Sequence, residues 1–231
     1  MSNRVSRMVL GAALASALIA VPAVAQERGF YVGGELGAIA SADTEQQYTP
    51  GGAVGTTGSL STDHELGFSG AAFAGYDFGM IRVEAEAGYQ SSGIDKVNSS
   101  FAVGAGTLAA GSQSASGDVT AQSVMLNGIW DAGEFEGFSF FLGGGAGMAK
   151  LKVSDLTTAG GATLLDDEAE DWLFAWPGMA GGRTALSANL DAHVRYRYMK
   201  VDEAEMVGLS GRAVTADFSS HTLAAGLTFK F

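Results

Sequence analysis

The sequence contains no cysteine and only 3 prolines among its 231 residues. Without cysteine the chain forms no disulfide and offers no thiolate to a metal. Basic residues are scarce too, since 13 Lys and Arg stand against 25 Asp and Glu, which gives a formal net charge of -12. Nucleic-acid binding needs clustered Lys and Arg, so this charge balance argues against it. The length suits one domain.

Long hydrophobic runs are also absent, except near the start of the chain. Residues 1–25 have the features of a secretory signal peptide: Arg4 and Arg7 precede an apolar stretch at 8–21, and Ala23-Val24-Ala25 forms a small-x-small cleavage site. A retained membrane helix is the alternative, but the apolar run is short for one. We therefore expect cleavage after residue 25.

The expected mature domain, residues 26–231, has no apolar run of the roughly 18 residues that a spanning helix needs. Loss of the two leader arginines brings its formal charge to about −14 by the same counting of ionised side chains. A secreted chain of this kind is either a soluble periplasmic protein or an outer-membrane barrel.

Apolar and polar residues alternate along much of the mature chain. In the final stretch, 221–231, Leu223, Leu227, Phe229 and Phe231 share one parity, while small or polar residues share the other. A period of two predicts a strand with one apolar face. An aromatic end on that face is typical of a membrane barrel, whose outer surface meets lipid.

Eight such stretches are expected as strands, at about 30–38, 66–76, 81–89, 119–130, 138–153, 171–181, 189–198 and 221–231. Between them lie long polar stretches at 41–65, 91–118, 154–170 and 201–219, alternating with short turns at 77–80, 131–137 and 181–184. The fold class predicted is all-β: an eight-stranded antiparallel up-and-down transmembrane β-barrel. It has four long external loops, three short periplasmic turns and both termini in the periplasm.

Two residues conflict with the alternating pattern. Lys150 falls on the outward parity of its strand, so we expect it at the rim of the barrel, or after a bulge that resets the phase. Pro177 cannot donate a ladder hydrogen bond, and a closed barrel has no free edge to hold it. We expect a bulge or a local break of pairing at Pro177.

The inward parity carries charges of both signs. A slip of one residue would place Arg195 and Arg197 in lipid, at up to ~2–4 kcal/mol each near the midplane, so the register is strongly specified. An eight-stranded barrel is just wide enough for side chains to fill it. We expect a packed, ion-paired lumen, with a narrow pore as the alternative, formed by Glu35, Arg82, Glu84, Glu86, Asp191, His193, Arg195, Arg197 and Lys230.

The predicted loops are strongly acidic. Carboxylates at the cell surface could hold a divalent cation, for example one that bridges to lipopolysaccharide phosphates. The alternative is a solvated, self-repelling loop, and the run lacks EF-hand spacing. The possible cation site comprises Asp166, Asp167, Glu168, Glu170 and Asp171.

Catalytic residues are hard to find in this sequence. Ser219, Ser220 and His221 lie at the top of the last strand, and His64 lies at the end of the first predicted loop. A Ser-His pair also needs hydrogen-bond reach and an orienting acid. We therefore expect no enzyme, no cofactor and no metal centre.

Aromatic residues gather at both ends of the predicted strands, as the two interfaces of a bilayer require. A soluble lipocalin-like barrel is the alternative, but its charged parity would face water, and here that parity is Gly-rich and balanced in sign. The belts comprise Tyr76, Phe78, Trp130, Phe135 and Phe138 at the short turns, and Tyr89, Trp172, Phe174, Tyr196 and Tyr198 at the long loops.

Four short motifs resemble those of eight-stranded outer-membrane barrels: Phe30-Tyr31-Val32-Gly33-Gly34, Phe73-Ala74-Gly75-Tyr76-Asp77-Phe78, Phe141-Leu142-Gly143-Gly144-Gly145 and Val194-Arg195-Tyr196-Arg197-Tyr198. That family includes the transmembrane domain of outer membrane protein A, opacity-type surface antigens and their alphaproteobacterial relatives. The ending Phe229-Lys230-Phe231 resembles the terminal signature that the barrel assembly machinery reads.

The resemblance implies an integral protein of a Gram-negative outer membrane. We expect a structural or surface-interaction role, with a low-conductance porin for small solutes as the alternative and a lipid A-modifying surface enzyme as the third hypothesis. The expected partners are outer-membrane lipid, lipopolysaccharide and, during biogenesis, the assembly machinery. We expect no nucleic acid and a monomeric chain.

Overall fold

The computed structural model describes residues 28–48, 58–64, 66–99, 111–158, 163–168, 172–208 and 212–231. The expected signal peptide lies outside these residues. In the described part of the chain there are strands and turns only, and so no helix long and apolar enough to cross a membrane.

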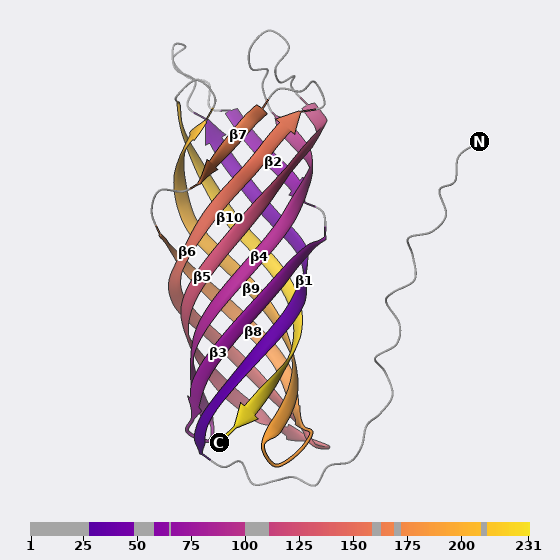
Figure 1. Ribbon diagram of the computed structural model, residues 1–231, viewed down its shortest axis with the longest axis vertical. Coiled ribbons are helices and arrows are strands. Elements are labelled where there is room, and N and C mark those ends of the chain that lie inside the picture. The colour runs from indigo at the N-terminus through magenta and orange to yellow at the C-terminus, as the bar shows by residue number, and fades with distance from the viewer. Residues whose placement is uncertain are drawn as a thin grey trace, which may run out of the picture.

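The strands form one closed antiparallel ring, in which β10 pairs back with β1 (Figure 1). Closure matters because an open sheet edge would leave backbone donors and acceptors unpaired in lipid. The strands are β1 (Gly29–Tyr48), β2 (Gly58–His64), β3 (Gly67–Asp77), β4 (Ile81–Ser99), β5 (Gly111–Phe135), β6 (Phe138–Thr158), β7 (Thr163–Glu168), β8 (Leu173–Ala185), β9 (Leu190–Gly208) and β10 (Arg212–Lys230).

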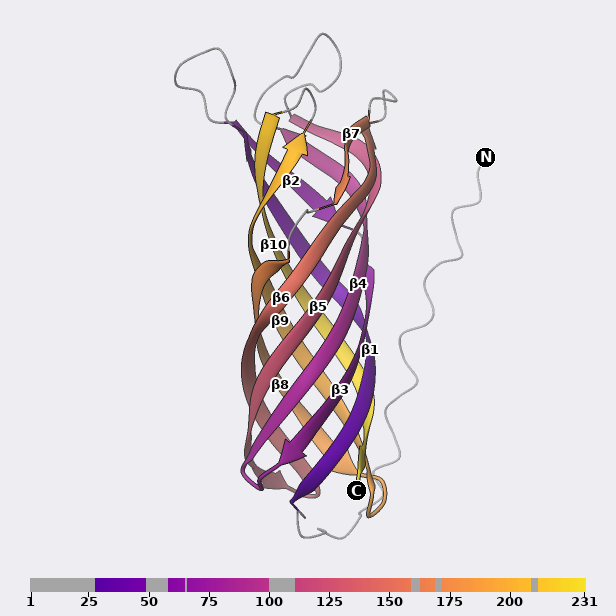
Figure 2. The ribbon, with the colours of Figure 1, turned by 60° about the vertical axis from the view of Figure 1, so that its left-hand side comes forward.

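These segments occupy eight positions around the ring. The short strand β2 continues the position of β3, because both pair with β1 on one side and β4 on the other. The short strand β7 continues the position of β8 beside β6, because it pairs with the part of β6 that lies beyond the start of β8. The predicted eight-stranded antiparallel barrel is thus confirmed, and it is seen from a second side in Figure 2.

The barrel is about twice as tall as predicted, because its strands run into the stretches expected as long loops. β1 has 20 residues; at ~3.3 Å per residue and a tilt of ~40° it rises about 50 Å. The apolar band of such a barrel is only ~25 Å tall. The predicted loops at 41–65, 91–118, 154–170 and 201–219 are therefore largely barrel wall in the described residues.

The turn predicted at 131–137 is much shorter in the structure. β5 continues to Phe135 and β6 starts at Phe138, so that only Glu136 and Gly137 connect them, with φ of 51° and 81°. Positive φ at both central residues is the geometry of a tight hairpin whose twist matches the strands. A register shift between Asp131 and Gly133 precedes this turn.

The turn predicted at 181–184 is wrong. β8 runs on to Ala185, and the chain reverses at 186–189. Gly181 lies in the wall, and the position needs glycine because a Cβ there would collide with the Phe141 ring inside the barrel and with the carbonyl oxygen of Val194. Glycine here permits a close approach in a strand, and sequence alone does not separate that use from a turn.

The two conflicting residues are resolved in different ways. The β6–β8 ladder keeps one register but lacks pairs between Gly144↔Gly178 and Gly147↔Ala175, next to Pro177. The expected local break is confirmed and the bulge is wrong. The β5–β6 ladder keeps one register past Lys150, so no bulge resets its phase and the side chain stays on the outward parity.

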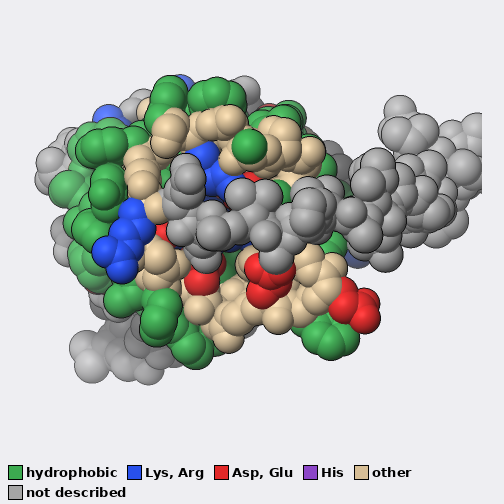
Figure 3. All heavy atoms as spheres, turned by 90° about the horizontal axis from the view of Figure 1, so that it is seen from below, with side chains coloured by type: hydrophobic (Ala, Val, Ile, Leu, Met, Phe, Trp, Pro, Cys, Tyr) green, Lys and Arg blue, Asp and Glu red, His purple; other side chains and the backbone are tan. Residues whose placement is uncertain are grey.

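Hydrophobic side chains cover the outside of the barrel from the turn end to its mid-height. In the end view they surround a centre that contains charged side chains (Figure 3). This band is the surface that would meet lipid. Among its exposed members are Phe30, Leu36, Val83, Leu126, Leu142, Val194, Leu223 and Leu227.

Higher up, the polarity of the wall inverts. On β9 the inward series changes from Arg197 to Met199 and Val201, which are buried. On the same strand the outward series changes from Tyr198 to Lys200. The barrel therefore has an apolar surface with a polar lumen in one half, and a polar surface with an apolar lumen in the other.

β6 inverts in the same way. Its outward residues change from Met148 to Lys150 and Lys152, and the buried inward residues beyond that level are Leu151 and Val153. The outward position of Lys150 follows from this inversion, because the residue lies where the outer surface turns from apolar to polar.

Candidate functional site

The candidate site is the lumen, and each strand delivers its charges there by simple alternation. β4 points Arg82, Glu84 and Glu86 inward, while its intervening residues Val83 and Ala85 face outward. β9 contributes its own inward series from the opposite side of the ring. The predicted lumen residues are all buried except Lys230 on β10, which is partly buried.

Arg197 holds two carboxylates in the middle of the lumen. Its guanidinium donates to Glu86 at 2.6 Å from both Nη1 and Nη2, and Nη2 also donates to Glu35 at 3.1 Å. A bidentate guanidinium–carboxylate pair fixes both distance and orientation. The contact therefore ties β9 to β4 and β1 across the lumen.

Arg195 lies one inward position along β9. It donates to the two carboxylate oxygens of Glu84 at 3.3 and 3.2 Å. Its guanidinium carbon also lies 5.2 Å from the ring centroid of Phe73 and 5.7 Å from that of Phe141. Aromatic faces stabilise a desolvated cation, so the rings and the carboxylate together replace the water that Arg195 has lost.

His193, Thr228, Tyr31 and Asn127 complete this central layer. His193 Nε2 lies 3.1 Å from Glu35 Oε2, and its Nδ1 lies 3.4 Å from the hydroxyl of Thr228. Tyr31 donates to Glu84 at 3.0 Å, and Asn127 donates to Glu86 at 3.1 Å. Each buried carboxylate therefore has several donors, as a charge withdrawn from water requires.

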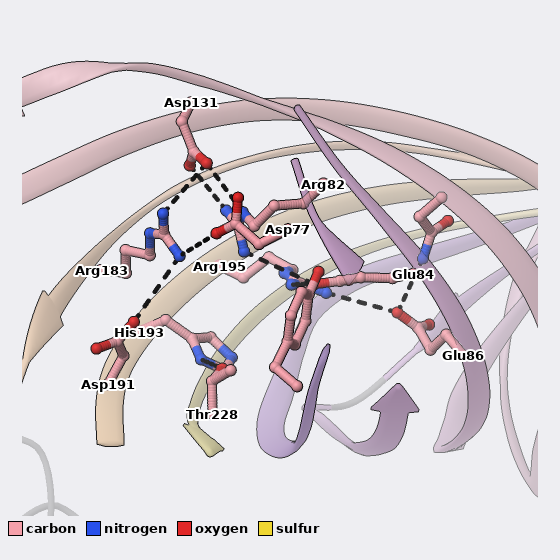
Figure 4. A network of polar contacts seen from close by, with 12 residues as sticks. Asp77, Arg82, Glu84, Glu86, Asp131, Arg183, Asp191, His193, Arg195 and Thr228 are labelled. Atoms are coloured by element: carbon pink, nitrogen blue, oxygen red, sulfur yellow. Dashed lines mark hydrogen bonds and ion pairs between the residues drawn. The ribbon is translucent and has the colours of Figure 1, made fainter. Parts of the chain in front are cut away.

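A second layer of ion pairs lies nearer the turns (Figure 4). Arg82 donates to Asp131 from Nε at 3.1 Å and from Nη2 at 3.0 Å. Arg183 donates to the same carboxylate at 3.2 Å. Lys230 donates to Asp191 at 2.8 Å. This layer links β10, the last strand, to the charged side chains at the turn end of the lumen.

Sequence reasoning missed three members of the lumen network: Asp77, Asp131 and Arg183. All three had been assigned to turns. Arg183 Nη1 lies 3.6 Å from Asp77 and 3.8 Å from Asp191. The signal that could have found Arg183 is parity, since it follows the inward residue Met179 by four positions on an unbroken strand.

The apolar half of the lumen lies beyond the central layer. Gln90 accepts a hydrogen bond of 2.9 Å from Ser220 at the change of polarity. Past it, buried apolar side chains from around the ring pack into one cluster: Ile39, Ile94, Val119, Ala121, Met125, Ala149, Leu151, Val153, Ala175, Met199, Val201 and Phe218. The lumen is therefore packed in three successive layers, two of them ionic and one apolar.

A comparison with models of protein families identifies the family of this chain. A model described as the outer membrane protein beta-barrel domain matches residues 10–231 of the chain. The chain belongs to this family. Membership places it among barrels of the Gram-negative outer membrane. No curated protein matches the chain.

Solved outer-membrane barrels have the same fold. The chain is similar to OprG from Pseudomonas aeruginosa, with 18% identity, a TM-score of 0.51, and coverage of 88% of this chain and 96% of that one. The outer membrane protease OmpT from Escherichia coli gives 10% identity, a TM-score of 0.50, and coverage of 88% and 97%. Since a protease is among them, the fold alone does not decide between enzyme and non-enzyme.

Ser220 and His221, two of the serine and histidine candidates of this outer-membrane barrel, do not form one site, while Ser219 shares the outward parity of His221. Ser220 is buried inside and donates to Gln90, while His221 faces outward and its Nδ1 lies 2.7 Å from the hydroxyl of Tyr196. The two side chains are on opposite sides of β10. The side chain of His64 lies outside the described part of the structure.

Of the remaining predicted sites, the structure describes the terminal aromatic residues but not the acidic side chains of the possible cation site. Phe231 is 73% exposed, its ring packs edge-on against Phe229 at 5.3 Å, and its amide donates to the carbonyl of Phe30 at 3.0 Å. The side chains of the acidic residues at 166–168, and residues 170 and 171 entirely, lie outside the described residues. In the described part of the chain no His, Cys, Asp or Glu cluster could hold a metal.

Proposed function

We propose that this protein is a non-conducting structural and surface-interaction barrel. Its turns and termini would lie in the periplasm, and its taller, inverted half would project from the cell. The observation that carries the proposal is the double closure of the lumen, first by paired charges and then by an apolar cluster. An ion would have to cross both barriers.

The two barriers block an ion for different physical reasons, which strengthens the proposal. In the ionic layers the charged groups that could bind a passing ion are already paired with one another, as Arg197 is with Glu86. The apolar layer, which includes Met199 and Phe218, offers no ligand at all to replace water of hydration. Rearranging one layer leaves the other closed.

The non-enzymatic part of the proposal rests on the separation of Ser220 from His221 across the wall, and on Ser219, which makes no hydrogen bond to His221 within the described residues. Nucleophilic catalysis needs a base within hydrogen-bond reach of the nucleophile. Lipid A mass spectrometry with and without the gene checks this part, and a modified lipid A that depends on the gene would contradict it.

Conductance of the refolded mature chain in a planar bilayer tests the proposal directly. Folding is first confirmed by heat-dependent gel mobility. We expect no channels from folded protein, and none from Glu84→Gln, since the apolar layer persists in that variant. Steady channels from the unaltered chain that change on Arg195→Met would instead support the low-conductance porin.

A further inference from the structure

The outward surface of β8, β9 and β10 carries apolar, aromatic and cationic side chains in order along the strands. Three successive rows cross these strands, defined by the register of β9 with its neighbours. Tyr196 pairs with Ala180 and Leu223, Tyr198 pairs with Gly178 and His221, and Lys200 pairs with Trp176 and Ser219. The rows thus change from apolar to aromatic to cationic toward the tall end of the barrel.

The middle row is held together by aromatic contacts. Tyr198 stacks 4.9 Å from His221 and meets Trp176 edge-on at 5.6 Å. His221 is fixed by its 2.7 Å contact with the hydroxyl of Tyr196. Tyr and Trp in such a cluster are typical of the level where lipid headgroups begin. The cluster therefore marks the boundary of the membrane on this side of the barrel.

Lys200 lies just beyond that boundary. It is half-buried and makes no ion pair within the described part of the chain. On β9 the next outward residue toward the membrane is Tyr198, which contacts His221. In the register of β9 with β10, Lys200 lies diagonally across from His221 on the same face, and an ammonium with an imidazole at that spacing is a favourable partner for a phosphate.

Below the cluster the wall is hollowed by an apolar groove of about 610 Å³. Its floor is formed by Ala180 and Gly182, which carry little side chain, and its sides by Phe140 and Leu142. Tyr196 and Leu223 line its end. Because Tyr196 also contacts His221, the groove and the aromatic row are parts of one surface.

We propose that this surface binds one phosphorylated lipid, with its phosphate at Lys200 and His221 and an acyl chain in the groove. Tyr196 and Lys200 are four residues apart on β9, or about 13 Å along the strand. That spacing separates a headgroup from the upper part of its chain. The occupant is a lipid because the groove opens within the apolar band of an outer-membrane barrel.

Charge supports the phosphate end. The whole sequence is acidic, with a formal charge of -12, and would repel an anion in general. Outward lysines at this level, Lys200 on β9 and Lys150 and Lys152 on β6, are local exceptions to that charge, and Lys200 lies next to the aromatic cluster of Tyr198 and His221. In the orientation proposed above, the lipid belongs to the outer leaflet and is a phosphorylated glycolipid of the lipid A class. This choice of leaflet rests on the proposed function, while the site itself does not.

Native mass spectrometry of the refolded mature chain in detergent tests the proposal. The probes are diphosphorylated lipid A, the same lipid without phosphates, phosphatidylglycerol, and lipid A with excess inorganic phosphate. We expect one retained diphosphorylated lipid A, and about tenfold less retention in Lys200→Ala and His221→Ala. Ala180→Leu should lower retention too, by filling the groove.

Matched controls lie on the opposite side of the ring. Lys96→Ala removes an exposed lysine from β4, and Ala87→Leu enlarges an outward alanine of the same strand. Both should retain lipid as the unaltered chain does, and heat-dependent mobility confirms that every variant is folded. Since all five altered positions face outward or are exposed, loss of folding is not expected.

Several results would overturn the site. Equal retention in Lys200→Ala and Lys96→Ala, or equal retention of the dephosphorylated lipid, would remove the phosphate contact. Displacement by inorganic phosphate would assign the site to free anions. Preferential retention of phosphatidylglycerol would contradict the outer-leaflet assignment while leaving the closed lumen unaffected, so the two proposals fail separately.

Discussion

Arg195 is the most constrained side chain of the lumen. It donates to Glu84 at 3.2 Å, lies 3.5 Å from both Glu35 and Glu86, and packs against two aromatic rings. Its Nε and Nη1 make no hydrogen bond, so part of its charge is balanced by ion contacts alone. A cation in this setting is costly to bury and more costly to remove from its partners.

Replacing Arg195 by Met should destabilise the barrel by ~3–5 kcal/mol, because Glu84 keeps its charge and loses its nearest cation. Unfolding by urea in lipid vesicles, followed by tryptophan fluorescence, measures the change. Arg28→Met is the matched control, since Arg28 is exposed at the turn end. Equal midpoints for the two variants would show that the central ion pair does not stabilise the fold.

Gly181 gives a second prediction at the residue scale. A Cβ at Gly181 would collide with Phe141 and with the Val194 carbonyl, so Gly181→Ala should cost ~1–3 kcal/mol. Gly178→Ala in the same strand adds a Cβ with nothing within 4 Å and should leave stability unchanged. The same urea titration compares the two variants. A Gly181→Ala variant as stable as Gly178→Ala would reject the close approach at Gly181.

Parity explains which lumen residues could be predicted from the sequence and which could not. Arg195 and Glu84 lie in unbroken alternating stretches, and their inward placement follows from the sequence alone. Arg183 follows two glycines, which are equally typical of a turn and of a crowded strand. What distinguishes the two is the Phe141 ring across the lumen, and only the fold brings that ring close to Gly181.

At the scale of elements, the last strand closes the barrel. β10 pairs with β9 on one side and with β1 on the other, so the ring cannot close before the final residues are in place. Phe231 adds one more hydrogen bond to this seam, to the carbonyl of Phe30. The exposed ring is nevertheless placed outside the ladder, where another molecule could read it.

Deleting Phe231 should lower the assembled fraction in cells while leaving refolding in detergent nearly intact. The reason is that the residue adds little packing but remains accessible at the end of the seam. Heat-dependent mobility of outer-membrane fractions provides the measurement. Phe78→Ala, which alters another exposed aromatic residue at the same end, is the control. Normal assembly of the deletion variant would reject a terminal signal.

The heights of the strands could not be predicted in the same way as their number. The sequence beyond Met148 and Tyr198 still alternates, but its polarity is reversed, and a reader of the lipid-facing pattern takes that reversal for a loop. Lys150 is a visible sign of the reversal, since it keeps the outward parity in a place where a membrane barrel would exclude it, and Lys152 shares that parity. The reversed half has a core of its own, and recognising it requires knowledge of which strands meet.

At the scale of the molecule, the inversion of polarity predicts where water begins. The chain has no cysteine, so single cysteines can be introduced against a clean background. In intact cells a membrane-impermeant thiol reagent should label Lys152→Cys, which lies on the polar outer surface. It should not label Val194→Cys, in the apolar band, or Met199→Cys, in the apolar lumen.

The three positions test separate statements. Labelling of Val194→Cys would contradict the depth of the band, and labelling of Met199→Cys would contradict the closed lumen. Silence of Lys152→Cys in intact cells, with labelling after the outer membrane is opened, would reverse the proposed orientation.

The tall half of the barrel also sets how far its tips stand from the bilayer. β6 continues from Met148 to Thr158; at ~3.3 Å per residue and a tilt of ~40° this stretch rises about 25 Å. A wall with its own apolar filling is stiff over that distance, as a scaffold of paired strands is. In the proposed orientation, whatever meets this protein from outside would do so at about that height above the apolar band.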